Sequence, residues 1–301
     1  MDLKDLYPAI EAASLEISPI CEPVIEKKCD ELGLSRQETF ILIAVPTFEP
    51  EPVSVKLLNV RSPYTSPDHY RKLLDNLSVK GMLQPVGLEG YRLTQRGLEG
   101  IKIFLNALYV TLSGIQPLPV TQMMDLASRL KDLADACLQA PDPPGTWCIR
   151  HSRRLDPGIR APMMARIDQF FDEFRAYRDD AHLAAWRGYE VNRHAWDILT
   201  HLWAGPEATP EMLNQALGRR GNSMEETLYA VDELIIKGWV NRETDKLRIT
   251  AFGREIRKTA EDTTDRYFLM PFRGFQETEL ERALELIDDY RQGIPRLSET
   301  R

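Results

Sequence analysis

The sequence predicts a mainly α-helical protein with two small β-hairpins. Three observations predict this class. Apolar residues recur at three- and four-residue spacing along most of the chain, as in amphipathic helices. Two short stretches, "LQPVGLEGYRL" and "WVNRETDKLRI", have the pattern of two strands around a tight turn. The chain also repeats its apolar pattern, so the two hairpins fall at corresponding positions.

The repeat covers nearly the whole chain. At an offset of 157 residues, the aligned apolar pairs run from Leu6 and Met163 to Leu77 and Leu234. After a one-residue deletion, "YRLTQRG" aligns with "LRITAFG". Proline and glycine between the copies indicate a linker. The predicted organisation is a first copy over 1–140, a linker rich in Pro, Gly and Arg over 141–157, and a second copy over 158–301.

Each copy is expected to contain six helices, with the hairpin after the fourth. Ser66 before Pro67 indicates a helix start, because serine caps helices and proline suits their first turn. The predicted helices of the first copy cover residues 2–30, 35–46, 52–60, 66–80, 95–113 and 121–138. Those of the second copy cover 161–187, 192–203, 209–217, 223–237, 252–269 and 276–291.

Composition limits the class of protein. The chain has 301 residues, 43% of them hydrophobic, and a net charge of -8. An acidic balance argues against non-specific coating of nucleic acid, although a local basic patch still binds DNA. There is no run of 18 apolar residues and no apolar leader, so we expect a cytoplasmic protein without a membrane partner. The four cysteines have no C-x-x-C spacing, which favours reduced thiols over a zinc site.

The order helix, helix, turn, helix and hairpin is the winged helix-turn-helix arrangement. In "LDNLSVKGMLQPVGLEGYRLTQRGLEGI" and "VDELIIKGWVNRETDKLRITAFGREI" the sequence resembles the MarR family of transcriptional regulators. Members of that family are dimers, so the resemblance implies a fused pseudo-dimer with two winged helix-turn-helix units and flanking dimerisation-type helices. The outer helices of the copies would then bury the stripes Leu126, Leu130, Leu133 and Leu280, Leu284, Ile287 against each other.

The resemblance implies transcription regulation through double-stranded DNA. The second helix of the motif would enter the major groove, and the wing would reach the backbone. Residues 52–102 hold eight Lys/Arg against four Asp/Glu, a local charge of +4 that favours phosphate contact. The residues predicted to contact DNA are Lys56, Arg61, His69, Arg71, Lys72, Asn76, Arg92 and Arg96 in the first copy, and Arg219, Arg220, Arg242 and Lys246 in the second.

The second copy is less suited to DNA. Residues 209–258 hold nine Lys/Arg against eight Asp/Glu, and its recognition-type helix carries Glu225, Glu226, Asp232 and Glu233. We expect an asymmetric DNA site contacted mainly by the first copy, because site symmetry follows protein symmetry. Alternatively, the acidic helix is a surface that binds a protein partner. The whole chain is then a tandem winged-helix adaptor with little or no DNA binding.

Aromatic residues are concentrated in the second copy. Family members often bind aromatic small molecules, so a ligand-responsive regulator would hold its effector among these rings. The alternative is that the rings form ordinary core. The residues predicted to bind the ligand are Phe170, Phe171, Trp186, Trp196 and Trp203.

Other reactive side chains form no recognisable site. His194, Asp197 and His201 share a helix without a further metal ligand, which favours histidines that bind no metal. Cys148 lies among arginines that would lower a thiol pKa, so it is either a redox sensor or an inert exposed thiol. No motif for nucleotide binding, hydrolysis or zinc catalysis occurs. We therefore expect no catalytic residues, no metal and no cofactor.

Overall fold

The computed structural model describes residues 3–205 and 207–298. Residue 2 of the first predicted helix and residues 299–301 of the second predicted copy lie outside this part. The first half contains, in order, α1 (Leu6–Leu32), α2 (Arg36–Ala44), α3 (Val55–Arg61), α4 (Pro67–Val79), β1 (Leu83–Val86), β2 (Gly90–Leu93), α5 (Gln95–Ser113) and α6 (Val120–Cys137).

The second half repeats this order of elements. It contains α8 (Met163–Trp186), α9 (Arg193–Ala204), α10 (Pro210–Ala216), α11 (Met224–Ile236), β3 (Val240–Glu243), β4 (Lys246–Ile249), α12 (Ala251–Phe268) and α13 (Glu277–Ser298). The predicted fold class is confirmed: the chain is mainly helical and carries two small antiparallel hairpins. We call α2–α4 with β1–β2 the first module, and α9–α11 with β3–β4 the second module.

Each hairpin is short, as expected. Four residues of β1 pair with four of β2, from Leu83 opposite Leu93 to Val86 opposite Gly90. An isolated bridge between Val53 and Tyr91 adds a third segment to this hairpin. The second hairpin is built in the same way, including its own bridge. Neither wing extends far from its module.

A threonine followed three residues later by a glycine joins each wing to the next helix. Thr94 caps α5, because its hydroxyl accepts a hydrogen bond from the Gly97 amide at 3.0 Å. A Cβ at Gly97 would lie 2.2 Å from the carbonyl oxygen of Met82, so only glycine fits. Thr250 and Gly253 repeat both features. The Thr-x-x-Gly pattern that aligned the two halves therefore has a structural role, which is to join each wing to the helix that follows it.

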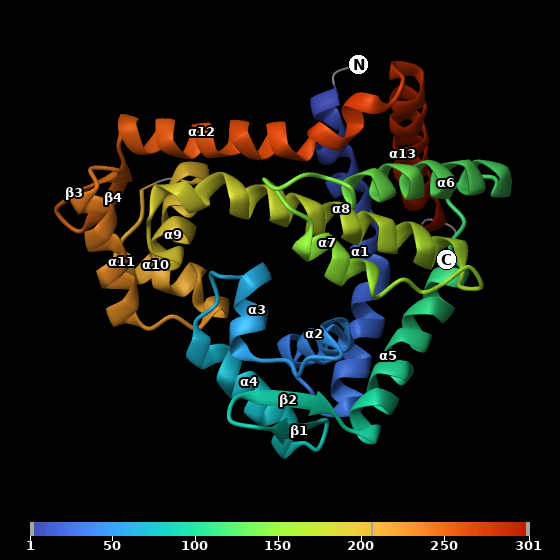
Figure 1. Ribbon diagram of the computed structural model, residues 1–301, viewed down its shortest axis with the longest axis horizontal. Coiled ribbons are helices and arrows are strands. Elements are labelled where there is room, and N and C mark those ends of the chain that lie inside the picture. The colour runs from blue at the N-terminus through green and yellow to red at the C-terminus, as the bar shows by residue number, and fades with distance from the viewer. Residues whose placement is uncertain (1–2, 206, 299–301) are drawn as a thin grey trace.

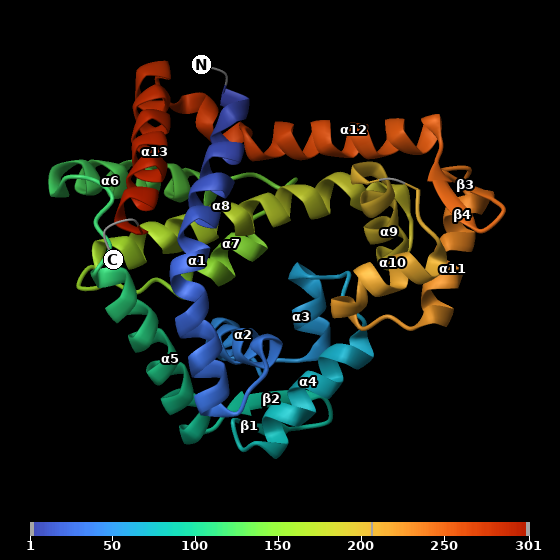
Figure 2. The same ribbon diagram turned by 180° about the vertical axis from the view of Figure 1, so that it is seen from behind.

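The long helices form a bundle that joins the modules (Figure 1). Helix α8 contacts α1, α5, α6 and α12, and α13 contacts α1 and α6. Figures 1 and 2 show the first and second modules at separate corners of a roughly triangular molecule, with their wings far apart. The predicted apolar stripes lie in the bundle, where Leu126, Leu130, Leu133, Leu284 and Ile287 are buried and Leu280 packs against them.

The two modules differ in how they join the bundle. Buried residues of the second module belong to the same hydrophobic cluster as the bundle, which extends from Leu6 to Ile294. The first module has a separate cluster that includes Leu42, Leu74 and Met82. The first module is thus a distinct packing unit, whereas the second is continuous with the bundle.

The predicted linker contains a buried helix. Within it, α7 (Trp147–Arg153) packs along α8. The carboxylate of Asp180 accepts hydrogen bonds from the backbone amides of Cys148 at 2.8 Å and Ile149 at 3.1 Å, which satisfies the start of α7. This segment is therefore part of the core rather than a loose connection.

None of the described helices has the length and apolar character needed to cross a bilayer.

Candidate nucleic-acid interface

Helix α4 has the two-sided character of a recognition helix. Leu73, Leu74 and Leu77 are buried in the core of the first module. Arg71 and Lys72 are exposed on the other side, and neither forms an ion pair with another described residue. Two cations without acidic partners on one exposed turn suit contact with a phosphate backbone.

The start of α4 differs in one detail from the expectation. The helix begins at Pro67 as predicted, but the Ser66 side chain makes no capping hydrogen bond. Instead the backbone amide of Ser66 donates to the carbonyl oxygen of Arg220 at 2.8 Å. The backbone amide of the residue before α4 is therefore paired with the other half of the chain.

The remaining predicted DNA contacts fall into two groups. Some side chains already have partners: Arg61 pairs with Asp179 at 3.0 Å, Arg92 donates to the Pro50 carbonyl at 2.9 Å, and Arg242 lies 3.8 Å from Asp232. Asn76 is half-buried on α4. The exposed basic residues without an ion pair in the described ranges are Lys56, Arg96, Arg219 and Lys246.

Helix α11 presents a different surface at matching positions. Leu228 and Tyr229 stand at the positions of Arg71 and Lys72, and Tyr229 is 70% exposed. Two acids of α11 have structural roles. Glu226 completes a capping box with Ser223, and the Glu233 carboxylate accepts from the backbone amide of Asn192 at 3.0 Å. The exposed side of α11 is therefore apolar and acidic, which does not suit a phosphate backbone.

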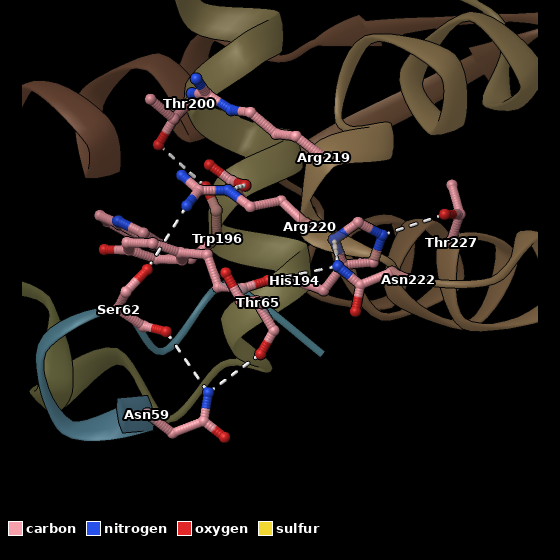
Figure 3. A network of polar contacts seen from close by, with 12 residues as sticks. Asn59, Ser62, Thr65, His194, Trp196, Thr200, Arg219, Arg220, Asn222 and Thr227 are labelled. Atoms are coloured by element: carbon pink, nitrogen blue, oxygen red, sulfur yellow. Dashed lines mark hydrogen bonds and ion pairs between the residues drawn. The ribbon is translucent and has the colours of Figure 1, made fainter. Parts of the chain in front are cut away.

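The modules meet directly at a polar contact that we call the inter-module seam: residues 219–222 of the second module against residues 62–69 and Gln37 of the first. Gln37 donates to the Arg219 carbonyl at 2.9 Å, and Asn222 donates to the Tyr64 carbonyl at 3.2 Å. Figure 3 shows Arg220 reaching the Ser62 hydroxyl across this contact.

Arg220 is the centre of the seam. Its guanidinium pairs with Asp197 at 3.0 Å, lies over the Tyr64 ring at 5.3 Å and reaches the Ser62 hydroxyl at 3.5 Å. Within the first module, His69 Nε2 donates a hydrogen bond to the Gln37 side-chain oxygen at 3.0 Å. Arg220 thus joins the modules, whereas His69 contacts Gln37 within the first module and lies close to Gly221 of the second.

His194 supports the second side of the seam. Its ring is buried and lies 3.0 Å from the Thr227 hydroxyl and 3.1 Å from the Asn222 amide (Figure 3). Burial lowers the pKa of His194, which favours its neutral form. No cluster of His, Cys, Asp or Glu suited to a metal ion occurs among the described residues.

The five aromatic residues predicted to bind a ligand pack into the interior. Trp186 and Trp196 stack with ring centroids 5.5 Å apart, and Phe170 and Phe171 are buried in the bundle cluster. Trp203 is partly buried, with the Arg257 guanidinium 5.0 Å from its ring. None of the five lines the cavities of about 580, 440, 420 and 370 Å³ in the described part of the chain. The rings therefore act as core at these positions.

Two cavities flank the seam instead. One, of about 440 Å³, lies between the first module and α7–α8 and is lined by Phe48, Tyr70, Trp147 and His151 among others. The other, of about 580 Å³, lies between the modules and is more polar. Tyr64 lines both. Sequence reasoning missed these residues, because nothing in their local pattern indicates that distant segments meet there.

Cys148 is neither exposed nor activated. Its side chain is fully buried in α7. Burial raises the pKa of the thiol, and the neighbouring Asp180 carboxylate raises it further. The nearby arginines do not offset these effects, so the expectation of a lowered thiol pKa is wrong. All four cysteines are buried and free of disulfides.

Comparison with known proteins supports the fold assignment of the second half. No curated protein and no solved structure matches the chain. The model of a helix-turn-helix family matches residues 156–296, which run from the end of the α7 region to α13. This match agrees with the helix-turn-helix arrangement of α9–α11 in the second half.

Proposed function

We propose that the protein is a transcription regulator in which two MarR-like winged-helix units, derived by tandem duplication, form a single-chain pseudo-dimer. The proposed units are residues 1–140 and 158–301, with 141–157 between them. Their equal order of elements and the α4 and α11 bounds, which differ by 157 residues, support duplication. The DNA partner is double-stranded, with an asymmetric site, in the cytoplasm.

The observation that carries DNA binding is the exposed pair Arg71 and Lys72 on α4. Both lie on the helix that the winged helix-turn-helix arrangement directs into the major groove. Lys56 and Arg96, also exposed, add positive charge to the same module. At the matching positions α11 has Leu228 and Tyr229, so the first module supplies the main contact.

Fluorescence anisotropy on genomic DNA fragments across a salt series tests this proposal. Arg71→Glu with Lys72→Glu should weaken binding about 100-fold, because two favourable phosphate or base contacts become repulsive. Wild-type affinity should also fall steeply with salt. The matched control is Arg160→Glu with Arg273→Glu, which changes the net charge equally at two exposed positions outside both modules. Equal losses in both double variants would refute a specific role for α4.

A second candidate function is that of a protein-binding adaptor. The exposed side of α11 favours it, because Tyr229 is 70% and Ile236 is 86% exposed next to Glu225 and Asp232. An apolar stripe with acidic neighbours suits a basic protein segment. Titrations that show no DNA binding at low salt, with loss of partner capture in Tyr229→Ala, would favour the adaptor.

The effector in this proposal is an aromatic small molecule, held by the 440 Å³ cavity rather than by the five core rings. Its volume and aromatic lining are those of ligand sites. The dye 8-anilinonaphthalene-1-sulfonate serves as the probe. Its fluorescence should rise on binding. This rise should be smaller in Leu155→Trp, because the larger side chain would fill the cavity near the C-terminal end of α7. Unchanged dye binding in that variant would place the ligand elsewhere.

A further inference from the structure

The inter-module seam covers the end of α4 that would read DNA. In helix-turn-helix proteins the N-terminal residues of the recognition helix contact base edges, and free amides at a helix start bind phosphates. Here the Ser66 amide donates to the Arg220 carbonyl, and Ser66 is only 4% exposed. Gly221 lies so close to His69 that an added Cβ would approach the His69 Cβ to 2.4 Å.

The contacts that close the seam are polar and separable. Gln37, Asn222 and Arg220 supply hydrogen bonds of 2.9–3.5 Å to groups on the opposite module. Hydrogen bonds of this kind contribute about 1 kcal/mol each, because water replaces them when they break. The buried clusters of the two modules are separate, and Tyr64 of the seam packs against the cluster of the second half.

The first module is built to move as a unit. Its buried cluster is separate from that of the bundle, and the 440 Å³ cavity lies beneath it. Two sets of contacts join it to α7: Arg154 donates to the carbonyls of Thr47 and Glu49, and Phe48 contacts Trp147 and His151. Two more reach α8: Arg61 pairs with Asp179 at 3.0 Å, and the Tyr64 ring lies 5.9 Å from that of Trp186. A separately packed unit joined by polar contacts suits a rigid-body opening.

We propose that the inter-module seam is an autoinhibitory contact. While it is closed, the second module occupies the N-terminal end of α4, and DNA binding requires the first module to swing away. The inference rests on the proposed DNA-binding function. It gives the second module a role that needs no base contact of its own, since Gly221 and Arg220 act on the first module.

Gly221→Ala opens the seam selectively. Gly221 has φ +70° and would press its new Cβ against His69, whereas Gly238 has φ +71° with nothing within 4 Å. Gly238→Ala is therefore the matched control for backbone strain. Gln37→Ala is a milder second variant, because it removes one hydrogen bond across the seam, to the Arg219 carbonyl, and one within the first module, to His69.

Spin labels report opening directly. Val79 and Ile236 occupy matching positions at the ends of α4 and α11 and are 88% and 86% exposed. All four native cysteines are buried, so labels attach to Val79→Cys and Ile236→Cys. Double electron–electron resonance should give a longer or broader distance distribution between the labels in Gly221→Ala and, to a smaller extent, in Gln37→Ala. Gly238→Ala should match the parent.

DNA affinity measured on the same variants completes the test. Gly221→Ala should bind DNA about tenfold more tightly than wild type, the gain expected if about a tenth of wild-type molecules are open. If wild type binds DNA and Gly221→Ala shows a longer distance without tighter binding, the autoinhibitory role is refuted but the proposed function is not. Unchanged distances in both seam variants overturn the autoinhibitory role as well. If neither wild type nor the opened variants bind DNA, the proposed function itself fails.

Discussion

The arginines of this protein have different roles according to the residues that surround them. Arg71 is exposed without an acidic partner, so its charge is available to a ligand. Arg220 is held by Asp197 and the Tyr64 ring, so its charge is already used inside the protein. Replacing Arg220 would therefore disturb the seam, whereas replacing Arg71 should leave the fold intact.

A buried histidine makes the stability of the second half depend on pH. The indole of Trp196 donates to His182 at 3.4 Å, and Thr264 lies 3.4 Å from its other nitrogen. Burial, helped by the Arg257 cation and opposed by Glu261, lowers the pKa of His182 to about 4. Because the unfolded histidine has a pKa of 6.5, the unfolded state takes up more protons between these values.

The predicted consequence is a loss of stability as pH falls. The contribution of neutral His182 should be complete above about pH 6.5 and disappear on approach to pH 4, at a cost of about 2 kcal/mol, reduced from the full shift because the ring is partly exposed. Urea titrations at several pH values measure it. His182→Gln, which cannot titrate, should flatten the profile, and an unchanged pH dependence in that variant would refute the assignment.

The aromatic residues and Cys148 show what could not be predicted from the sequence at the scale of single residues. The five aromatics fit a core and a ligand pocket equally well by pattern, because both need apolar rings at helical spacing. Burial favours the core, and Trp196 is completely buried. The lowered pKa expected for Cys148 is wrong because burial raises the thiol pKa, and because the Asp180 carboxylate, 32 positions away in sequence, raises it further.

At the scale of elements, the periodic helices were predictable and the contacts between them were not. The repeated apolar pattern predicted α4 and α11 closely, since local amphipathicity determines which side of such a helix is buried. Helix α7 was missed because proline and glycine surround a helix of seven residues, stabilised by Asp180 of α8. The seam joins short polar side chains about 158 positions apart, for which no local signal exists.

Because the two hydrophobic clusters are separate, a side-chain truncation in one should loosen different parts of the molecule than a similar truncation in the other. Leu74 on α4 and Leu130 on α6 are both fully buried, but in separate clusters. Leu74→Ala and Leu130→Ala should each cost about 3 kcal/mol. Hydrogen exchange should accelerate only in the first module for Leu74→Ala, and across the bundle and second module for Leu130→Ala.

The exposed Val79 provides the control for this comparison. Val79→Ala, on the same helix as Leu74, should change stability by less than about 0.5 kcal/mol, because the side chain is 88% exposed. Faster exchange in α8 or α13 caused by Leu74→Ala would show that the first module is not a separate unit.

The whole molecule combines two similar modules with unequal surroundings. The bundle holds the second module rigidly and leaves the first attached through helix ends, a cavity and the seam. The family match lies on the second half, while the exposed basic pair lies on the first. The proposed division of roles is that one module contacts DNA and the other controls access to it.

Hydroxyl-radical footprinting tests this division most directly, on DNA fragments that the wild-type protein selects from a random pool. One strongly protected segment, lost in the Arg71→Glu, Lys72→Glu variant, is the predicted result. Two equally protected segments about 10 base pairs apart, as a symmetric dimer gives, would contradict the account. Protection that survives the double charge reversal would contradict it too.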